Sequence, residues 1–194
     1  MENENNSAFR VVVIGNDSVG KTSILTRLIQ NKFSPYEPGT IGANYQVYHE
    51  IVEGESVDMQ IWDTAGQERF KSLTPVYCRN AAAGVVVFSL TNRVSFNELN
   101  HQVEEFIDIA SDNAIVFVAA NKSDMVDDFE VSFEEAKQYA VDTNIRVFLT
   151  SAKSGEGIKQ LFSELARELH AKKQNKFTPV PGLEENNQEG KCKC

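Results

Sequence analysis

The sequence predicts an α/β fold built on a mostly parallel six-stranded sheet, with one antiparallel edge strand and helices on both faces. Two observations indicate this fold. Short apolar runs alternate along the chain with segments whose apolar residues recur at helical spacing. Each polar cluster comes directly after an apolar run, so a parallel sheet would gather these clusters along one rim, outside the carboxyl ends of its strands.

The first expected strand, residues 9–15, is apolar on both faces, as in a central strand covered by helices. Residues 15–22 follow the template G-x-x-x-x-G-K with a final Ser or Thr, in which backbone N–H groups surround a phosphate chain. Lys21 would reach the outer phosphates, and the Thr22 hydroxyl would bind Mg²⁺. A glycine-containing turn that ends in Lys-Thr by chance is the competing interpretation. The other expected phosphate-loop contacts are Asp17, Ser18, Val19, Gly20 and Ser23.

A helix over about residues 21–30 follows, and residues 31–44 then form a loop with two prolines and two glycines. A loop of this length inside a small domain is often functional. Two further strands, 45–52 and 56–62, are joined by a tight turn and supply the antiparallel edge of the sheet.

Asp63 comes directly after the second of these strands. In an open parallel sheet, ligand-binding groups collect at strand ends, which places this carboxylate beside the Mg²⁺ expected at Thr22. Capping of the next helix by Asp63 is the alternative interpretation.

The rest of the chain continues the alternation of strands and helices. Residues 84–88 and 114–120 are expected strands, and a capping box of Ser95 and Glu98 is expected to begin the helix between them. After these come a helix capped by Ser132 and Glu135 that runs to about residue 142, a short strand at 146–149, and an amphipathic helix with the apolar residues Ile158, Leu161, Phe162, Leu165 and Leu169.

Two polar clusters at later strand ends, residues 121–124 and 151–153, suit the recognition of guanine. The Asp124 carboxylate could accept hydrogen bonds from both the ring N–H and the exocyclic amine, an arrangement that adenine lacks. Taken alone, Asn-Lys-x-Asp is also a common surface turn, but beside a phosphate loop it favours a guanine nucleotide. Asn121 could bind across to neighbouring loops and the base edge, the stems of Lys122 and Lys153 could lie along the base faces, and the Ala152 N–H could donate to the guanine carbonyl. Ser151 is also expected among the nucleotide-binding residues.

The chain of 194 residues is long enough for one domain with a full core. We expect a disordered start at residues 1–7, a nucleotide-binding domain at 8–172 and a flexible polar tail at 173–194. The net charge of -9 argues against a nucleic-acid partner, because phosphate backbones are held by clustered Lys and Arg. No apolar run is long enough for a membrane span or a signal peptide, so we expect a cytoplasmic location.

Over about residues 9–172 the chain resembles the small GTPases of the Ras superfamily, and most closely the Rab family. Residues 62–70 carry the most specific part of this resemblance, supported by residues 40–42 and by the terminal cysteines Cys192 and Cys194. The resemblance implies the P-loop fold of small GTPases. It also implies a GTP-binding switch that hydrolyses GTP slowly to GDP and phosphate and recruits effectors in vesicle trafficking.

The resemblance further implies roles for single residues. Thr40 is similar to the threonine that binds Mg²⁺ and senses the γ-phosphate, and Gly66 to the backbone contact with that phosphate. Gln67 is similar to the residue that orients the attacking water, and Phe33 to the aromatic residue packed against guanine. The implied catalytic set is Lys21, Thr40 and Gln67, and the implied Mg²⁺ ligands are Thr22, Thr40 and Asp63.

Partners follow from the same resemblance. Tyr45, Trp62 and Tyr77 match the aromatic trio that Rab proteins present to effectors, and Cys192 and Cys194 match the cysteines that carry geranylgeranyl groups. The implied partners are an exchange factor, a GTPase-activating protein, a GDP-dissociation inhibitor, and geranylgeranyl transferase with its escort protein. We expect a monomer that cycles between the cytoplasm and the cytoplasmic face of endomembranes through its prenyl groups.

Asp17 departs from the family, which usually has a small residue at this position of the phosphate loop. A carboxylate there could repel the γ-phosphate or crowd the catalytic water and an incoming arginine, or it could point to solvent and do little. The alternative function is therefore a hydrolysis-impaired membrane recruiter that depends on guanine nucleotide. A kinase that uses ATP would leave the cluster at residues 121–124 without a role.

Overall fold

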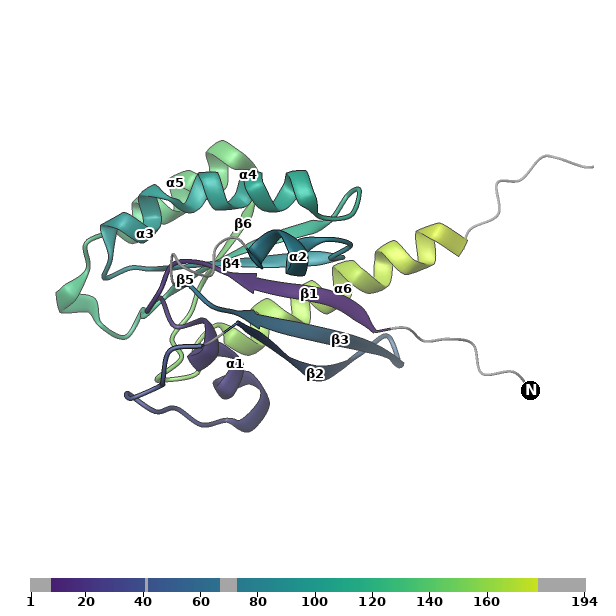
Figure 1. Cartoon of the computed structure of the whole chain (residues 1–194), viewed down its shortest axis with the longest axis horizontal. Helices are drawn as coiled ribbons and strands as arrows, with labels where there is room; N and C mark the ends of the chain where they lie inside the picture. Colours follow the sequence, from purple (N-terminus) through teal and green to yellow (C-terminus); the bar gives the residue numbers. More distant parts are fainter. Residues whose placement is uncertain (1–7, 41, 67–72, 178–194) are drawn as a thin grey trace, which may run out of the picture.

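The computed structural model describes residues 8–40, 42–66 and 73–177, with the side chains of the last three left out. Its core is one six-stranded sheet in the order β2-β3-β1-β4-β5-β6 (Figure 1). Neighbouring strands are parallel except for the β2–β3 pair, so the predicted fold class is confirmed. The strands are β1 (Phe9–Ile14), β2 (Ala43–Val52), β3 (Glu55–Thr64), β4 (Ala83–Ser89), β5 (Ile115–Asn121) and β6 (Arg146–Leu149).

Helices cover both faces of this sheet (Figure 1). Alternate residues of each central strand enter opposite cores: Val11 and Val13 pack with α1 and α6, whereas Val12 and Ile14 pack with the helices of the other face. All four are buried, which explains why this strand is apolar on both sides. The helices are α1 (Lys21–Gln30), α2 (Thr74–Cys78), α3 (Arg93–Asn97), α4 (Leu99–Ile109), the 3₁₀ turn η2 (Val126–Asp128), α5 (Phe133–Thr143) and α6 (Ile158–Phe177).

The β2–β3 hairpin forms as expected. Glu53 and Gly54 make its two-residue turn, both with positive φ (52° and 86°), which suits the right-handed twist of the flanking strands. The pairing brings Tyr45 opposite Trp62 and continues to Ala43 opposite Thr64. Both strands are therefore longer than the sequence alone indicates.

The predicted capping box of Ser95 and Glu98 is wrong. The helix begins earlier, at Arg93, because Asn92 caps it by accepting a hydrogen bond from the Ser95 N–H at 3.1 Å. Ser95 is buried in the first turn, where its hydroxyl accepts from the Ser89 N–H (3.0 Å) and donates to the Asn92 carbonyl (2.7 Å). The second predicted box is confirmed, since the Ser132 and Glu135 side chains each bind the other's backbone N–H at the start of α5.

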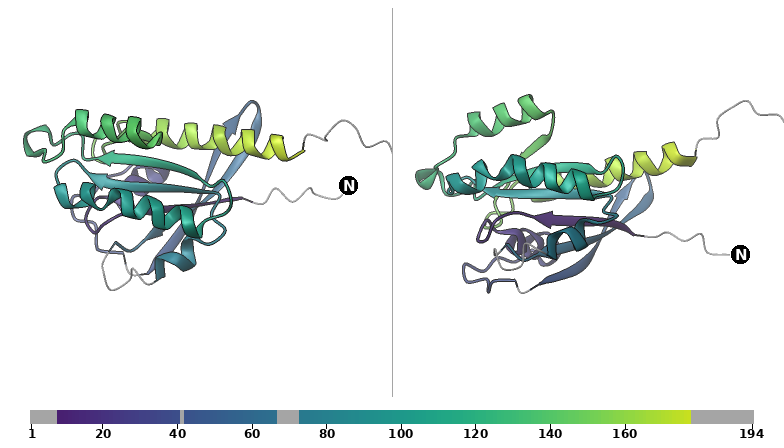
Figure 2. Two further views of the ribbon diagram at one scale, coloured as in Figure 1. Left: turned by 90° about the horizontal axis from the view of Figure 1, so that it is seen from above. Right: turned by 45° about the horizontal axis from the view of Figure 1, so that its top comes forward.

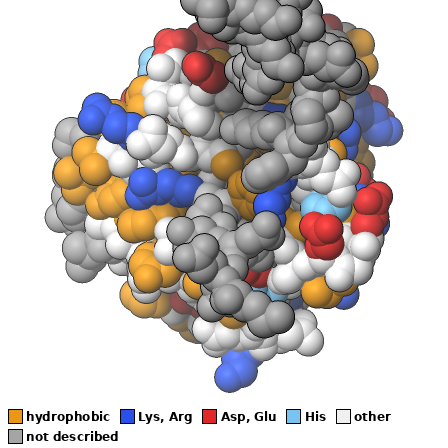
Figure 3. Space-filling view, turned by 90° about the vertical axis from the view of Figure 1, so that its right-hand side faces the viewer, with side chains coloured by type: hydrophobic (Ala, Val, Ile, Leu, Met, Phe, Trp, Pro, Cys, Tyr) orange, Lys and Arg blue, Asp and Glu red, His pale blue; other side chains and the backbone are white. Residues whose placement is uncertain are grey.

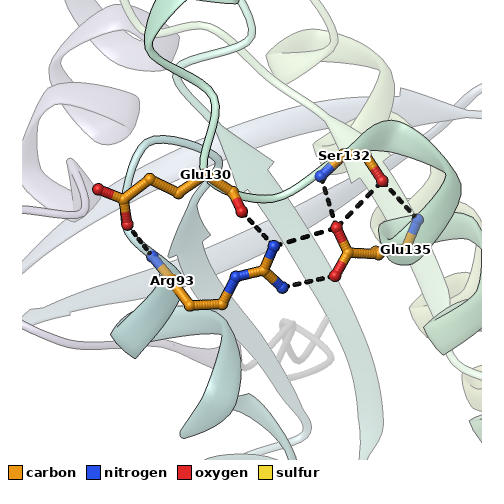
Figure 4. Close-up of polar contacts among 4 residues, drawn as sticks. All are labelled: Arg93, Glu130, Ser132 and Glu135. Atoms are coloured by element: carbon orange, nitrogen blue, oxygen red, sulfur yellow. Dashed lines mark hydrogen bonds and ion pairs between the residues drawn. The ribbon is translucent and has the colours of Figure 1, made fainter.

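Arg93 joins the starts of α3 and α5 (Figure 4). Its guanidinium donates to both carboxylate oxygens of Glu135, at 2.5 and 3.1 Å, and to the main-chain oxygen of Glu130. Its backbone N–H donates to the Glu130 carboxylate at 2.7 Å. These bonds, with those from the Glu130 and Val131 N–H groups to the Leu90 carbonyl, hold the segment that leads from β5 into α5.

Helix α6 runs on past the sheet, toward the side of the molecule from which the chain enters β1 (Figure 2). It continues to Phe177, beyond residue 172, where we expected the domain to end. Within the described residues, no helix combines the length and apolar character needed to cross a membrane. The expected disordered start, Gln67, and the tail from residue 178 on with Cys192 and Cys194 lie outside the described residues.

Candidate functional site

The loops that follow β1, β3, β5 and β6 meet at the carboxyl edge of the sheet, as predicted, and enclose a cavity of about 680 Å³. Fourteen predicted site residues line it: Asp17, Ser18, Gly20, Lys21, Thr22, Ser23, Phe33, Thr40, Gly66, Asn121, Lys122, Asp124, Ala152 and Lys153. Val19 and Ser151 are fully buried and lie outside the cavity lining. Asp63 lies outside it too, bonded to Thr22.

The phosphate loop needs glycine at both template positions, because a side chain at either one would clash with a neighbouring strand. A Cβ on Gly15 would lie 2.2 Å from the Val87 carbonyl oxygen, and one on Gly20 would lie 2.4 Å from Nδ2 of Asn121. Both glycines also have positive φ, 148° and 99°, which other residues rarely adopt. The loop can therefore pack against β4 and β5 while the N-terminus of α1 faces the cavity.

Lys21 is buried at the floor of this loop. Its ammonium donates to the carbonyl oxygens of Gly15 (2.9 Å) and Asn16 (2.6 Å). Burial lowers the pKa of Lys21 to about 8, against the opposing charges of Asp63 and Asp17, so the group remains mostly protonated at pH 7. A cation fixed at this point can stabilise negative charge that develops on a bound phosphate.

Gly66 crosses directly over that ammonium. A Cβ at Gly66 would lie 2.4 Å from both the Lys21 Nζ atom and the Asn16 carbonyl oxygen. No side chain fits there, so the backbone after β3 lies directly against the phosphate loop.

The oxygen atoms of three side chains, Thr22, Thr40 and Asp63, meet near Lys21. The Thr22 hydroxyl donates to Oδ2 of Asp63 at 2.7 Å, and the Thr40 hydroxyl lies 2.8 Å from that of Thr22 and 3.5 Å from the same carboxylate oxygen. The other oxygen of Asp63, Oδ1, is buried and has no hydrogen-bond partner among the described residues. Burial raises the pKa of Asp63, while the Thr22 hydroxyl and the Lys21 charge oppose that rise.

This set fits Mg²⁺, which prefers hard oxygen ligands and keeps several of its waters. A divalent cation would offset the cost of burying the Asp63 carboxylate and would occupy its free oxygen. The helix-capping alternative for Asp63 is wrong, because this residue lies within β3 and the next described helix, α2, has Leu73 at its N-cap.

Asn121 joins the phosphate loop to the loop after β6. Its Nδ2 donates to the Val19 carbonyl at 2.8 Å, and its Oδ1 accepts from the Ala152 N–H at 3.3 Å. The predicted bridging to neighbouring loops is therefore present. The Ala152 N–H, which we expected at the guanine carbonyl, is directed at Asn121 in this structure.

The Asp124 carboxylate is oriented by two residues of the loop after β6. The Ser151 hydroxyl donates to its Oδ1 at 2.6 Å, and the Lys153 ammonium lies 3.8 Å from its Oδ2. A carboxylate fixed in this way presents its acceptors in a defined direction, which recognition of two neighbouring N–H groups requires.

Asn16 is a site residue that the sequence analysis missed. Its side chain donates to the Glu98 carboxylate at 2.8 Å and accepts from Nε2 of Gln102 at 2.6 Å. Both partners belong to the α3–α4 segment, more than 80 residues away along the chain, and the template leaves Asn16 unrestricted. No local pattern could reveal this link.

The three predicted effector residues lie together away from the cavity. Trp62 stacks on Tyr77 with ring centroids 5.8 Å apart and an interplanar angle of 27°, and it contacts Tyr45 at 5.1 Å. The Arg10 guanidinium lies over the Trp62 ring, 4.5 Å from its centroid. Tyr45 is 46% exposed, so this aromatic cluster reaches the surface.

Comparison with known proteins identifies the family of this chain. Residues 10–171 match the Ras family. The chain is 41% identical over 168 residues to a putative Ras-related protein Rab-5B of Dictyostelium discoideum, covering 86% of this chain and 78% of the relative. It is 38% identical over 171 residues to the Ras-related protein Rab5A of Oryza sativa subsp. japonica, covering 88% and 84%. The chain belongs to the Rab family of small GTPases, within the Ras superfamily.

Proposed function

We propose that this protein is a membrane-trafficking switch that binds GTP, hydrolyses it slowly to GDP and phosphate, and recruits effectors in its GTP form. The observation that carries the proposal is the position of Thr40. Its hydroxyl, on the loop between α1 and β2, lies 2.8 Å from the Thr22 hydroxyl on α1. A loop held in this way by a metal and the γ-phosphate is released when that phosphate leaves, which changes the surface that partners bind.

Several groups would act in hydrolysis. Lys21 and the N–H groups of the phosphate loop would stabilise charge on the β- and γ-phosphates. Thr22, Thr40 and Asp63 would hold Mg²⁺, which when bound would neutralise phosphate charge. Gln67, outside the described residues, would orient the attacking water. An activating protein that inserts an arginine would accelerate the reaction by on the order of 10⁵.

Asp17 supports a second candidate function, a recruiter whose hydrolysis is impaired. Its side chain is exposed and lines the cavity, and its charge acts on the buried Lys21. A carboxylate here would repel the γ-phosphate and hinder an incoming arginine. The protein would then remain in its GTP form and stay active at the membrane.

Membrane attachment would come from geranylgeranyl groups on Cys192 and Cys194, because two lipid chains anchor stably where one is marginal. Figure 3 shows the end of the molecule at which the described chain starts and α6 finishes. Basic, acidic and hydrophobic side chains are interspersed over the described part of this face. We therefore assign the attraction to lipid anchors rather than to surface charge, and place the protein in the cytoplasm and on cytoplasmic faces of endomembranes.

The proposed partners are those that such a cycle requires. An exchange factor would open the nucleotide cavity, an activating protein would complete the hydrolytic site, and a GDP-dissociation inhibitor would cover the prenyl groups. Geranylgeranyl transferase with its escort protein would attach those groups. Effectors would bind the aromatic cluster of Tyr45, Trp62 and Tyr77.

Single-turnover hydrolysis of Mg²⁺-GTP tests the proposal, with wild type measured beside Asp17→Ser and Gln67→Leu. A slow wild-type rate that Gln67→Leu abolishes would support the switch. A rate near zero that Asp17→Ser restores would favour the impaired recruiter. Failure of all three proteins to bind GTP would contradict both.

A further inference from the structure

Arg27 connects the helix that follows the phosphate loop to the loop after β6, on the side away from the nucleotide cavity. It lies on α1, the helix that begins with Lys21 and Thr22, and its guanidinium is directed toward the loop after β6. Nε donates to the Ala152 carbonyl at 2.8 Å, and the second terminal nitrogen donates to the Lys153 carbonyl at 2.6 Å. The first terminal nitrogen donates to the carbonyl and side-chain oxygens of Asn31, at 3.0 and 3.1 Å.

In these four bonds all three nitrogens of the planar guanidinium donate at once, in directions fixed relative to one another. Because its donors are planar and fixed, binding the main-chain carbonyl of Asn31 at the end of α1 also fixes the direction of the donors that hold residues 152 and 153. The stem packs as well, with the Arg27 Cδ atom 3.5 Å from the position a Cβ would take on Gly155. A flexible ammonium could not hold two consecutive carbonyls in the same way.

The loop that Arg27 holds carries the groups expected to read the base. Ser151 donates to the Asp124 carboxylate at 2.6 Å, and the Ala152 N–H donates to the Asn121 side chain at 3.3 Å. A shift of residues 151–153 would therefore loosen Asp124 without touching the phosphate loop directly. Arg27 itself does not line the nucleotide cavity.

We propose that Arg27 is a positioning residue for guanine specificity: it holds the Ser151–Lys153 loop so that Asp124 can distinguish guanine from bases that lack the exocyclic amine. This inference rests on the proposed binding of guanine nucleotide. Loss of Arg27 weakens recognition of the base more than it weakens binding of the phosphates.

The test is dissociation of GDP and of IDP, which lacks the exocyclic amine, from the full-length protein with Mg²⁺ present. Arg27→Met keeps most of the stem and removes every donor. We expect it to speed GDP release by at least about tenfold and IDP release by clearly less, so the IDP-to-GDP ratio of release rates falls. Arg27→Lys keeps the charge but not the planar set of donors, and its ratio should lie between those of Arg27→Met and wild type.

Asn31→Gly is the matched control. It removes only the side-chain acceptor of Arg27, and glycine tolerates the positive φ of 53° at residue 31. The main-chain carbonyl of residue 31 still accepts from the guanidinium and orients it, so the bonds to residues 152 and 153 stay in place. Its ratio should stay at the wild-type value.

An unchanged ratio in Arg27→Met, with equal acceleration of both nucleotides or only a lower melting temperature, would overturn the specificity role and leave the proposed function intact. If Arg27→Met does not fold, an unchanged ratio in folded Arg27→Lys overturns it equally. A wild-type protein that does not retain GDP in preference to IDP would instead contradict the guanine-binding function from which the inference starts.

Discussion

The side-chain amide of Asn121 donates to the main-chain oxygen of Val19 at 2.8 Å and thereby ties the end of β5 to the phosphate loop. Asn121 is buried, and its Oδ1 accepts from the Ala152 N–H. One side chain thus holds both loops on either side of the cavity.

Asn121→Ala should therefore weaken phosphate and base binding together. The Val19 carbonyl and the Ala152 N–H would lose their partner in a buried setting, at a cost of about 1–3 kcal/mol in the free energy of unfolding. We expect faster release of GDP and IDP alike, in contrast to Arg27→Met. Chemical unfolding and nucleotide release measure the two effects, with the exposed Asn100→Ala on α4 as a control; a variant that released only GDP faster would contradict this account.

The Asp63 carboxylate should make nucleotide binding depend on Mg²⁺, because its Oδ1 is buried without a partner among the described residues. In wild type, removal of Mg²⁺ with EDTA should speed GDP release. In Asp63→Asn, which keeps the shape but removes the charge, release should already be fast and EDTA should change it little.

Asp58→Asn is the control for that experiment, since Asp58 lies on the same strand but pairs with His49 on the hairpin. It should retain the full response to EDTA. A response of Asp63→Asn equal to that of wild type would remove Asp63 from the metal site.

Patterns within a few residues predicted much of this fold. The helix at 21–30 and the strand at 146–149 end where the sequence places them, and Ser132 caps α5 as expected. In each case turn residues, caps and apolar spacing point to the same structure. The position of the cavity at one edge of the sheet could be predicted for a related reason: the loops that follow parallel strands all lie at the same edge.

The failures came from bonds between distant segments. Ser95 and Glu98 satisfy a capping pattern, but Asn92 offers a competing cap and the Ser95 hydroxyl binds the end of β4 instead. Arg27 meets Ala152 across 125 residues, and spacing along one helix cannot identify that partner. Side chains that position a site from behind are therefore the least visible in a sequence.

Gly84 should tolerate no larger residue, because α4 packs directly on it. A Cβ at Gly84 would lie 2.7 to 2.8 Å from three ring atoms of Phe106, a fully buried side chain. Gly84→Ala should lower the free energy of unfolding by about 1–3 kcal/mol, since a full core must shift to admit the methyl group.

Phe106→Leu in the same protein provides the test of that cause. The smaller side chain should relieve the overlap, so Gly84→Ala should cost less in the Phe106→Leu background than in wild type. Equal costs in the two backgrounds, measured by denaturant unfolding, would mean that the ring is not the obstacle.

Glu135 should make stability depend on pH in acid. The Arg93 guanidinium, with the Ser132 backbone N–H, lowers the pKa of Glu135 to about 2 from an ordinary value of 4.5. A carboxylate whose pKa is depressed in the folded state stabilises that state fully above the unfolded pKa, and this contribution disappears as the pH falls through the folded value. Wild type should therefore be more stable than Glu135→Gln at pH 7, and the difference should shrink below about pH 4.5 and vanish near pH 2.

Glutamine at residue 135 can still bind the Ser132 N–H, so the comparison isolates the charge rather than the cap. The neighbouring exposed Glu134→Gln serves as the control. In an Arg93→Met background the pH-dependent difference should be much smaller, because the guanidinium that depresses the pKa is gone. A difference between wild type and Glu135→Gln that is the same at pH 3 and pH 7, or that persists unchanged without Arg93, would show that this ion pair does not link α3 to α5 energetically.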